Sequence, residues 1–337
     1  YDIIVAPLSE EAGEFMRWAA GRVPAVCRAV QCDEESPTQV FSVAPDAHLF
    51  LRSNSPAATI QEQLLRGTAL NTQAIESALA NHIGSLANLP ALPATFSRLQ
   101  RVLTNPDCSI DKVSDIIAQD LGLSAKVLQL VNAALVNTRQ PIVSAEHAVK
   151  LVGLRGIRDL TLSVEVMSEL AEAAPHLASF LEETQLRALR AAKLASRVMG
   201  GGPEADNAYS ACLFHAIGRM TLLVHANETY SKVDLIQRKT NQSREDVEME
   251  LLGLTHQDVT AYLLRLWGLP LAVVEAAQFW HRPADIQHYR FTVLDATHVA
   301  MNLVLAFETG DIRNANIDHD LIYALHRAQS VGRWQIY

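Results

Sequence analysis

The sequence contains few cysteines and no long apolar segment. Its four cysteines are Cys27, Cys32, Cys108 and Cys212, and no two of them form a C-x-x-C pair. We therefore expect free thiols, as in a reducing cytoplasm. No apolar run reaches the roughly 18 residues that span a membrane, and no signal peptide is recognisable, so the pattern favours a soluble cytoplasmic protein. The chain begins at Tyr1 instead of methionine, and we expect further residues upstream.

Positive charge is also scarce. There are 28 lysines and arginines against 37 aspartates and glutamates, which gives a formal net charge of −9. This balance argues against bulk binding of nucleic acid, and we expect no direct nucleic-acid partner. Hydrophobic residues make up 49% and charged residues only 19%, which excludes a disordered chain. At roughly 150 residues per domain, the length indicates about two domains.

Three short apolar runs in the N-terminal part are typical of buried strands. They are DIIV at 2–5, AVCRAV at 25–30 and AHLFLR at 47–52. A helical pattern separates the first two, and residues 57–83 read as a helix with Ile60, Leu64, Leu65 and Ala69 on one face. Strands that alternate with helices predict a small parallel sheet, as part of an α/β fold.

The pattern changes after Gly84. The stretch NLPALP at 88–93 predicts a linker, because proline restricts its own backbone and that of the preceding residue. From Ala94 to the end, apolar residues recur at spacings of three and four residues, which predicts helices throughout. Ser109, Ser124 and Ser144 are expected to begin three of them as N-cap residues.

The helical part resembles the HDOD domain, an all-helical signalling module related to the HD phosphohydrolases. The resemblance begins at LPALPATFSRLQRVLTNPDCSIDKVSDIIAQDLGLSAKVLQLVNAA and continues through PIVSAEHAVKLVGLRGIRDL, LFHAIGRM, HQDVTAYLLRLWGLP and AAQFWHRP. The matching positions are Leu89, Pro90, Leu92, Pro93, Asp120, Leu123, Lys126, Leu128, Asn132, Ala148, Leu151, Gly153 and Leu160. The fold class that this resemblance implies is mainly α.

HD enzymes hold metal ions with a set of histidines and aspartates, and the resemblance shows what stands at each position here. Arg187 falls near the first histidine, and a guanidinium cannot donate to a metal. His215 and Ala216 occupy the His-Asp pair, so the bridging carboxylate is missing. The late aspartate falls near Met301 or Asn302, whose amide is a weaker, neutral ligand.

His256 and His281 remain as further candidates. Three histidines, His215, His256 and His281, can hold Zn²⁺ with one open position if they converge. The alternative, which we favour, is that they are hydrogen-bonded core residues. We therefore expect no metal, no cofactor and no catalytic residue, with Arg187, His215, Ala216, His256, His281 and Asn302 as vestigial positions.

The N-terminal part resembles the second half of a response-regulator receiver domain, a flavodoxin-like α/β fold. Its three strands would be the third, fourth and fifth strands of that fold. Pro7 or Ala6 then occupies the phospho-acceptor position, and neither can accept a phosphoryl group. The switch serine or threonine of a receiver falls near Cys32, and the lysine that ends its fifth strand falls near Ser53. If the alignment is displaced, Glu10 or Glu11 lies near the phospho-acceptor position.

These resemblances predict three regions. Residues 1–56 are a partial, degenerate receiver-like segment, residues 57–88 are a connecting helix and linker, and residues 89–337 are the HDOD domain. Trp267 and Trp280, which flank the GLP turn, are expected to be core or interface anchors.

The predicted function is bacterial signal transduction without catalysis, through binding of other signalling proteins, with a homodimer as the commonest assembly. Two alternatives remain open. One is a metal-dependent phosphohydrolase that acts on a cyclic nucleotide. The other is a nucleotide sensor without hydrolysis, in which Arg187 and Arg219 near His215 would suit a phosphate group.

Overall fold

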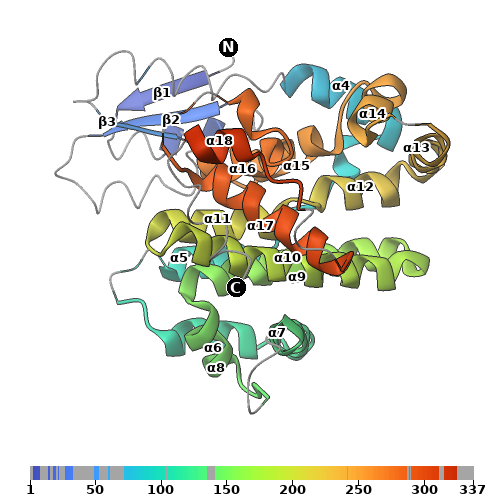
Figure 1. Ribbon diagram of the computed structural model, residues 1–337. Coiled ribbons are helices and arrows are strands. Elements are labelled where there is room, and N and C mark those ends of the chain that lie inside the picture. Colours follow the sequence, from blue (N-terminus) through green and yellow to red (C-terminus); the bar gives the residue numbers. More distant parts are fainter. Residues whose placement is uncertain are drawn as a thin grey trace.

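The fold is mainly helical, with a small sheet at its N-terminal end (Figure 1). The computed structural model describes residues 3–7, 14–15, 18–19, 22, 27–32, 49–52, 60, 72–103, 105, 107–134, 141–240, 242–286, 288, 290–310 and 315–324. Glu10, Glu11 and Ser53 lie outside these residues. Within them, no helix is both long and apolar enough to cross a lipid bilayer.

Three parallel strands form the sheet in the order β1-β2-β3. They are β1 (Ile3–Pro7), β2 (Cys27–Cys32) and β3 (Leu49–Arg52). Ala29 in the middle strand pairs with Val5 on one side and Leu49 on the other, and it is fully buried. The predicted strands and their parallel arrangement are confirmed, although β1 and β2 end two residues later than the apolar runs.

Helices account for the regular structure in the rest of the chain, and no strand follows β3 among the described residues. The longer helices are α4 (Thr72–Ile83), α5 (Ala94–Leu103), α7 (Leu121–Ala134), α9 (Leu154–Ala173), α10 (Ala178–Met199), α11 (Pro203–Phe214), α13 (Asn227–Lys239), α15 (His256–Leu266) and α17 (Val293–Glu308). The shorter ones are α6 (Ile110–Ala118), α8 (Ala145–Val152), α12 (Ile217–His225), α14 (Arg244–Leu252), α16 (Leu271–Phe279) and α18 (His319–Ala324), with single 3-10 turns at Leu86–Asn88, Pro175–Leu177 and Pro283–Asp285. This confirms the all-helical pattern predicted from Ala94 onward.

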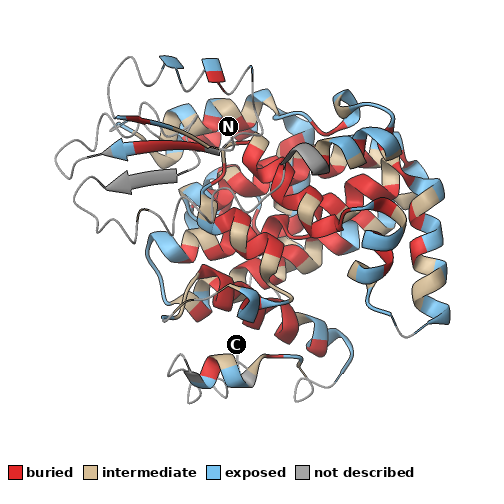
Figure 2. Ribbon diagram, turned by 90° about the horizontal axis from the view of Figure 1, so that it is seen from above, coloured by how far each residue is buried: buried red, intermediate tan, exposed pale blue. Residues whose placement is uncertain are grey.

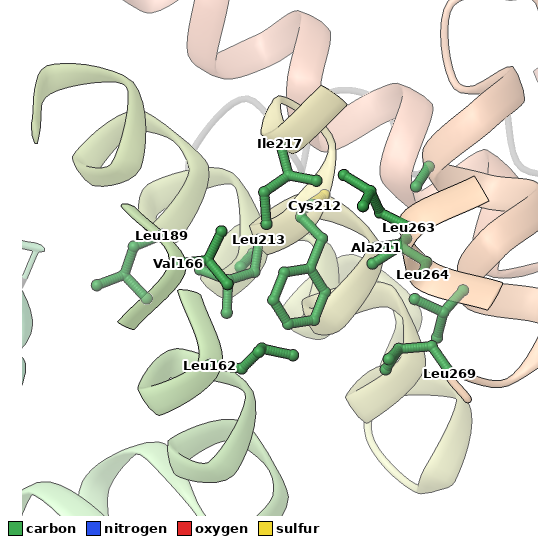
Figure 3. Close-up of a cluster of buried hydrophobic side chains, with 14 of the residues drawn as sticks. Leu162, Val166, Leu189, Ala211, Cys212, Leu213, Ile217, Leu263, Leu264 and Leu269 are labelled. Atoms are coloured by element: carbon green, nitrogen blue, oxygen red, sulfur yellow. The ribbon is translucent and has the colours of Figure 1, made fainter. Parts of the chain in front are cut away.

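Buried residues gather in the helices at the middle of the helical part (Figure 2), and α11 contributes to this core. Every residue from 208 to 214 is buried, so the helix contacts neighbours on all sides. Side chains of α9, α10, α11, α12 and α15 meet there, including Leu162, Leu189, Leu213 and Leu263 (Figure 3). The packing of α11 therefore fixes the position of the residues that follow it, which begin with His215.

Helix α4 belongs to the same core. Ile75, Leu79 and Ile83 recur at four-residue spacing on one face, and all three are buried in it. The hydroxyl of Tyr262 on α15 donates a hydrogen bond of 3.0 Å to Glu76. Residues 72–83 of the predicted helix are thus helical and packed against the HDOD-like part.

Two of the three predicted N-caps are confirmed. Ser109 and Ser144 each accept a hydrogen bond from a backbone N–H in the first turn of α6 and α8. The prediction for Ser124 is wrong, because α7 begins at Leu121 and the carboxylate of Asp120 accepts from the N–H of Leu123 at 2.9 Å. Aspartate caps as well as serine does, and it comes first along the chain.

Asn132 joins the end of α7 to the segment before α8. Its side-chain amide donates to the carbonyls of Leu128 and Ile142, at 2.9 and 2.8 Å, and its oxygen accepts from the N–H of Ile142 at 2.7 Å. Ile142 is only 2% exposed, so water cannot replace Asn132 as its partner.

We predict that Asn132→Ala lowers the free energy of unfolding by about 2 kcal/mol, because the buried backbone groups of Ile142 lose their partner. Urea denaturation measures the change. Gln129→Ala, on the same helix, removes only an exposed hydrogen bond to Glu182 and should cost less than about 0.5 kcal/mol. Equal losses in the two variants would contradict the role of Asn132.

Candidate functional site

The candidate site is built around the tight turn between α11 and α12, where the sequence reads HAIG. His215 ends α11, Ala216 lies in the turn and α12 begins at Ile217. Gly218 then packs directly on the first turn of α15. A Cβ atom at Gly218 would lie 2.2 Å from the carbonyl oxygen of His256 and 2.4 Å from the nitrogen of Thr260.

The hydroxyl of Thr260 stabilises this contact through hydrogen bonds. It accepts a hydrogen bond from the N–H of Gly218 at 3.0 Å. Its own proton can go to the carbonyl of His256 at 3.0 Å or that of His215 at 3.2 Å. One buried side chain thus connects the backbones of α11, α12 and α15.

His215 is a neutral, buried histidine. It is 9% exposed, and its Nδ1–H donates to the carbonyl of Cys212 at 2.7 Å. Burial lowers the pKa of His215 to about 4, and the nearby charges of His256, Arg187 and Arg219 act in the same direction. With the proton on Nδ1, the Nε2 atom keeps a free lone pair.

His256, the first residue of α15, is held by a buried carboxylate. Its Nδ1 donates to Glu248 at 2.7 Å, its backbone N–H does so at 2.9 Å, and Tyr230 adds a third hydrogen bond at 2.5 Å. Burial would raise the pKa of Glu248, but these hydrogen bonds outweigh burial and hold the pKa below its usual value. Glu248 is therefore a carboxylate that orients the His256 ring.

His281 lies just beyond α16 and near His256, whose charge acts on it. Burial lowers the pKa of His281. Its ring is 6.0 Å from that of Trp280, and the Trp280 ring is also 6.0 Å from that of His215, both edge to face. The structure thus brings His215, His256 and His281 into one region, together with Ala216.

Arg187 and Asn302 are both committed to structural partners. Arg187 on α10 forms an ion pair of 2.6 Å with Glu308 on α17. The amide of Asn302 donates to the carbonyl of His298 one turn earlier, at 2.9 Å. The prediction that Arg187 offers its charge to a phosphate is therefore weakened, since Glu308 already neutralises it.

Three partners in this region were not identified from the sequence. Glu248 and Tyr230 come from α14 and α13, and no motif marks them. His298 donates from Nδ1 to the carbonyl of Trp280 at 2.6 Å and accepts from the N–H of Asp318 at 2.8 Å. Its position four residues before Asn302, on the same helix face, is the one signal that could have indicated it.

The side chains present do not supply the oxygen ligands of an HD metal site. Ala216 has no donor atom, Arg187 is a cation, and the Asn302 amide is used within its helix. Among the described residues, no group of three or more histidines, cysteines, aspartates and glutamates has the arrangement of a metal site. The residues at these positions therefore do not fit the metal centre of the HD enzymes.

We predict that Gly218→Ala destabilises the protein by at least about 2 kcal/mol, because the new methyl group meets backbone atoms that cannot move aside. Thermal unfolding measures the loss. Gly122→Ala is the matched control, since it is also helical and its Cβ would meet only the Asp120 carboxylate at 3.4 Å. That variant should be neutral or slightly stabilised through helix propensity.

We also predict that His215 makes the protein less stable in acid. Because its folded pKa is lowered, the unfolded chain takes up the proton first, so stability falls from about pH 6.5 to about pH 4 and this contribution then stays constant. The loss from this group is on the order of 3 kcal/mol. His215→Asn keeps a donor for Cys212 but cannot titrate, so its free energy of unfolding should depend less steeply on pH.

Urea denaturation across this pH range provides the test, with the exposed His147→Asn as control. Burial also lowers the pKa of three other histidines, His225, His281 and His298. The free energy of unfolding should therefore keep some dependence on pH in every variant. An unchanged slope in His215→Asn would contradict the prediction.

Comparison with known proteins shows which family and which solved structures this fold resembles. The HDOD domain profile matches residues 89–283. An HDOD domain protein of unknown function from Geobacter sulfurreducens superposes with a TM-score of 0.57 at 20% identity, over 79% of this chain and 90% of that one. A protein from Shewanella amazonensis SB2B, provisionally named a phosphohydrolase, gives 0.53 at 21% identity over 77% and 87%.

Two further matches differ in extent. A protein from Marinobacter aquaeolei VT8, provisionally named for signal transduction, gives a TM-score of 0.54 at 18% identity and covers 98% of this chain and 83% of that one. An uncharacterized protein of Treponema pallidum (strain Nichols) is 26% identical over 269 residues, which are 79% of this chain. The chain spans about half of that relative, 51% of its length. The profile match covers more than half of the sequence and confirms the resemblance of the helical part: the chain belongs to the HDOD domain family.

Proposed function

We propose that this protein is a non-catalytic signal-transduction protein of the bacterial cytoplasm, whose HDOD domain acts by binding other signalling proteins. The N-terminal sheet would belong to a degenerate receiver-like segment that regulates this binding.

One observation carries the non-catalytic part of the proposal. The three positions that would supply metal ligands beside the histidines hold a methyl group, an amide and a guanidinium, at Ala216, Asn302 and Arg187. The last two are engaged with His298 and Glu308 at 2.9 and 2.6 Å. The HD enzymes hold their metal ions with aspartates as well as histidines, and none of these three groups provides a carboxylate oxygen.

The receiver-like part of the proposal is supported by strand order. The third, fourth and fifth strands of a flavodoxin-like sheet are parallel neighbours, as β1, β2 and β3 are. Pro7 is the last residue of β1, where the phospho-acceptor would stand, and it is exposed. A segment with proline at this position would regulate by docking and not by phosphorylation.

A contact between the sheet and the helical domain gives such docking a route. Ile60 and Leu271, the first residue of α16, both pack against Ala29 of β2. The other end of α16 leads directly to Trp280 and His281 in the candidate site. A regulatory segment that shifts against α16 would therefore act on Trp280 and His281.

The rival function, a metal-dependent phosphohydrolase, also has one observation in its favour. His215 and His256 each donate from Nδ1 to an oxygen atom, of Cys212 and Glu248, which is how the outer partners of metal-bound histidines orient the ring. Measuring bound metal separates the two functions.

We predict that the protein retains only substoichiometric Mn²⁺, Fe²⁺ or Zn²⁺ after incubation and dialysis, and that it does not hydrolyse bis-p-nitrophenyl phosphate above the rate of His215→Ala. Elemental analysis and absorbance provide the two measurements. The positive control restores the expected ligands in one variant with Arg187→His, Ala216→Asp and Asn302→Asp, which should gain metal. Near-stoichiometric metal in the wild type that is lost in His215→Ala would contradict the proposal.

A further inference from the structure

A cavity of about 200 Å³ lies between α7 and the two helices α9 and α10. The 3-10 turn Pro175–Leu177 joins α9 to α10, and α7 packs on both helices. Ala171 and Ala178, on either side of this turn, both line the cavity, and their small side chains leave room there. One water needs roughly 10–15 Å³ of such a volume, so the cavity has room for a small organic molecule.

The base of the cavity is apolar. Leu130, Met167 and Leu181 line it, one from each of the three helices, and they are at most 5% exposed. All three also belong to the main hydrophobic core, which holds them in place by packing. An apolar group of a ligand that lies against these side chains leaves water, which favours binding roughly in proportion to the ligand area that is buried.

Two charges without an ion-pair partner lie at the mouth of the cavity, on opposite helices. Lys126 on α7 and Glu182 on α10 are exposed residues that line it. The ammonium group of Lys126 donates to the hydroxyl of Ser168 at 2.7 Å, and the carboxylate of Glu182 accepts from the amide of Gln129 at 2.6 Å. Both of these partners are neutral, so within the described part of the chain each charge is left uncompensated.

Gln185 adds a polar group on the side of α10. It follows Glu182 by three residues, so the two side chains share a face of the helix. Gln185 is only 7% exposed, and its amide nitrogen donates to the hydroxyl of Ser163 at 3.1 Å. Its amide oxygen accepts from no described residue and is available to a donor. The α10 side of the cavity therefore offers acceptors, whereas Lys126 offers a cationic donor on the α7 side.

We propose that this cavity binds a free α-amino acid with an apolar side chain, such as leucine or methionine. The ammonium group of the amino acid would donate to Glu182 and Gln185, its carboxylate would accept from Lys126, and its side chain would contact the apolar base. Such hydrogen bonds between charged groups are stronger than those between neutral groups. An amine or a carboxylic acid alone leaves one of the two protein charges unmatched, and only a zwitterion matches both.

This inference goes beyond the proposed function, because it gives a protein that acts by binding a small-molecule input. It does not rest on that proposal, since neither the HAIG turn nor its histidine partners line the cavity. Titration calorimetry and thermal unfolding test it with L-leucine, L-methionine and L-phenylalanine, and with glycine, which lacks a side chain. We expect the three apolar amino acids to bind and to raise the melting temperature, because they stabilise only the folded state, and we expect no binding of glycine.

Two derivatives of leucine test the two charges separately. N-acetyl-L-leucine has no ammonium group and L-leucinamide has no carboxylate, so each should bind about fivefold more weakly than L-leucine, or less. Glu182→Gln and Lys126→Met should weaken L-leucine by a similar factor. Glu182→Gln should not weaken N-acetyl-L-leucine further, because the group that Glu182 would contact is absent. Glu228→Gln and Lys232→Met, in an exposed pair on α13, are the matched controls and should leave the affinity unchanged.

A third variant tests the cavity itself. Ala178 is exposed and lines the cavity, so Ala178→Phe can fill the space without entering the core. This variant should lose binding of all three apolar amino acids. Each variant is compared with its own unliganded melting temperature, so that altered stability is not mistaken for altered binding.

Three results would overturn the inference. The first is that none of the three apolar amino acids binds the wild type. The second is binding that stays equally tight in Lys126→Met, Glu182→Gln and Ala178→Phe. The third is that N-acetyl-L-leucinamide, which carries neither charge, binds as tightly as L-leucine, because the cavity would then take a side chain of a peptide and not a free amino acid.

Discussion

The candidate site depends on the contact between Gly218 and the first turn of α15. Only a residue without a side chain lets the backbones of α12 and α15 approach this closely, since a Cβ atom would come within 2.2 Å of a carbonyl oxygen. His215 stands three residues before this contact and His256 is at it, so the crossing itself brings the two histidines together. The next residue, Arg219, then turns toward Phe180 on α10. The glycine of the HAIG turn is thus needed for packing, whether or not any chemistry takes place beside it.

Much of the fold follows from local patterns in the sequence. The three strands, the change to helices after Gly84 and the caps at Ser109 and Ser144 all depend on short-range preferences, and all are confirmed. Ser124 shows the limit of this reasoning. Asp120 and Ser124 are both adequate N-cap residues and lie four positions apart, so residue type alone does not choose between them; the helix begins after Asp120.

The site was less accessible to prediction, for a physical reason. The residue types showed which positions cannot supply metal ligands, because a methyl group or a guanidinium lacks a free lone pair. They did not show what these side chains do instead, since the partner of Arg187 is 121 residues away on α17. Likewise, Trp280 packs against the core as expected, but nothing in the sequence shows that its ring is edge to face with that of His215 or that its N–H has no partner. Hydrogen-bond satisfaction is a property of the folded chain, and spacing along the sequence does not report it.

Helix α16 is the element that relates the sheet to the site. It has only nine residues, with Leu271 against Ala29 at its start and Trp280 directly after its end. Along its length it packs on α11, α15 and α17, the helices that also form or border the site. A short helix held on several sides shifts as a rigid unit, because close-packed interiors do not deform continuously. A change at the sheet therefore reaches Trp280 only if α16 has two packing arrangements. The contact of Leu271 with the sheet is small, so the first turn of α16 is the place to look for these two arrangements.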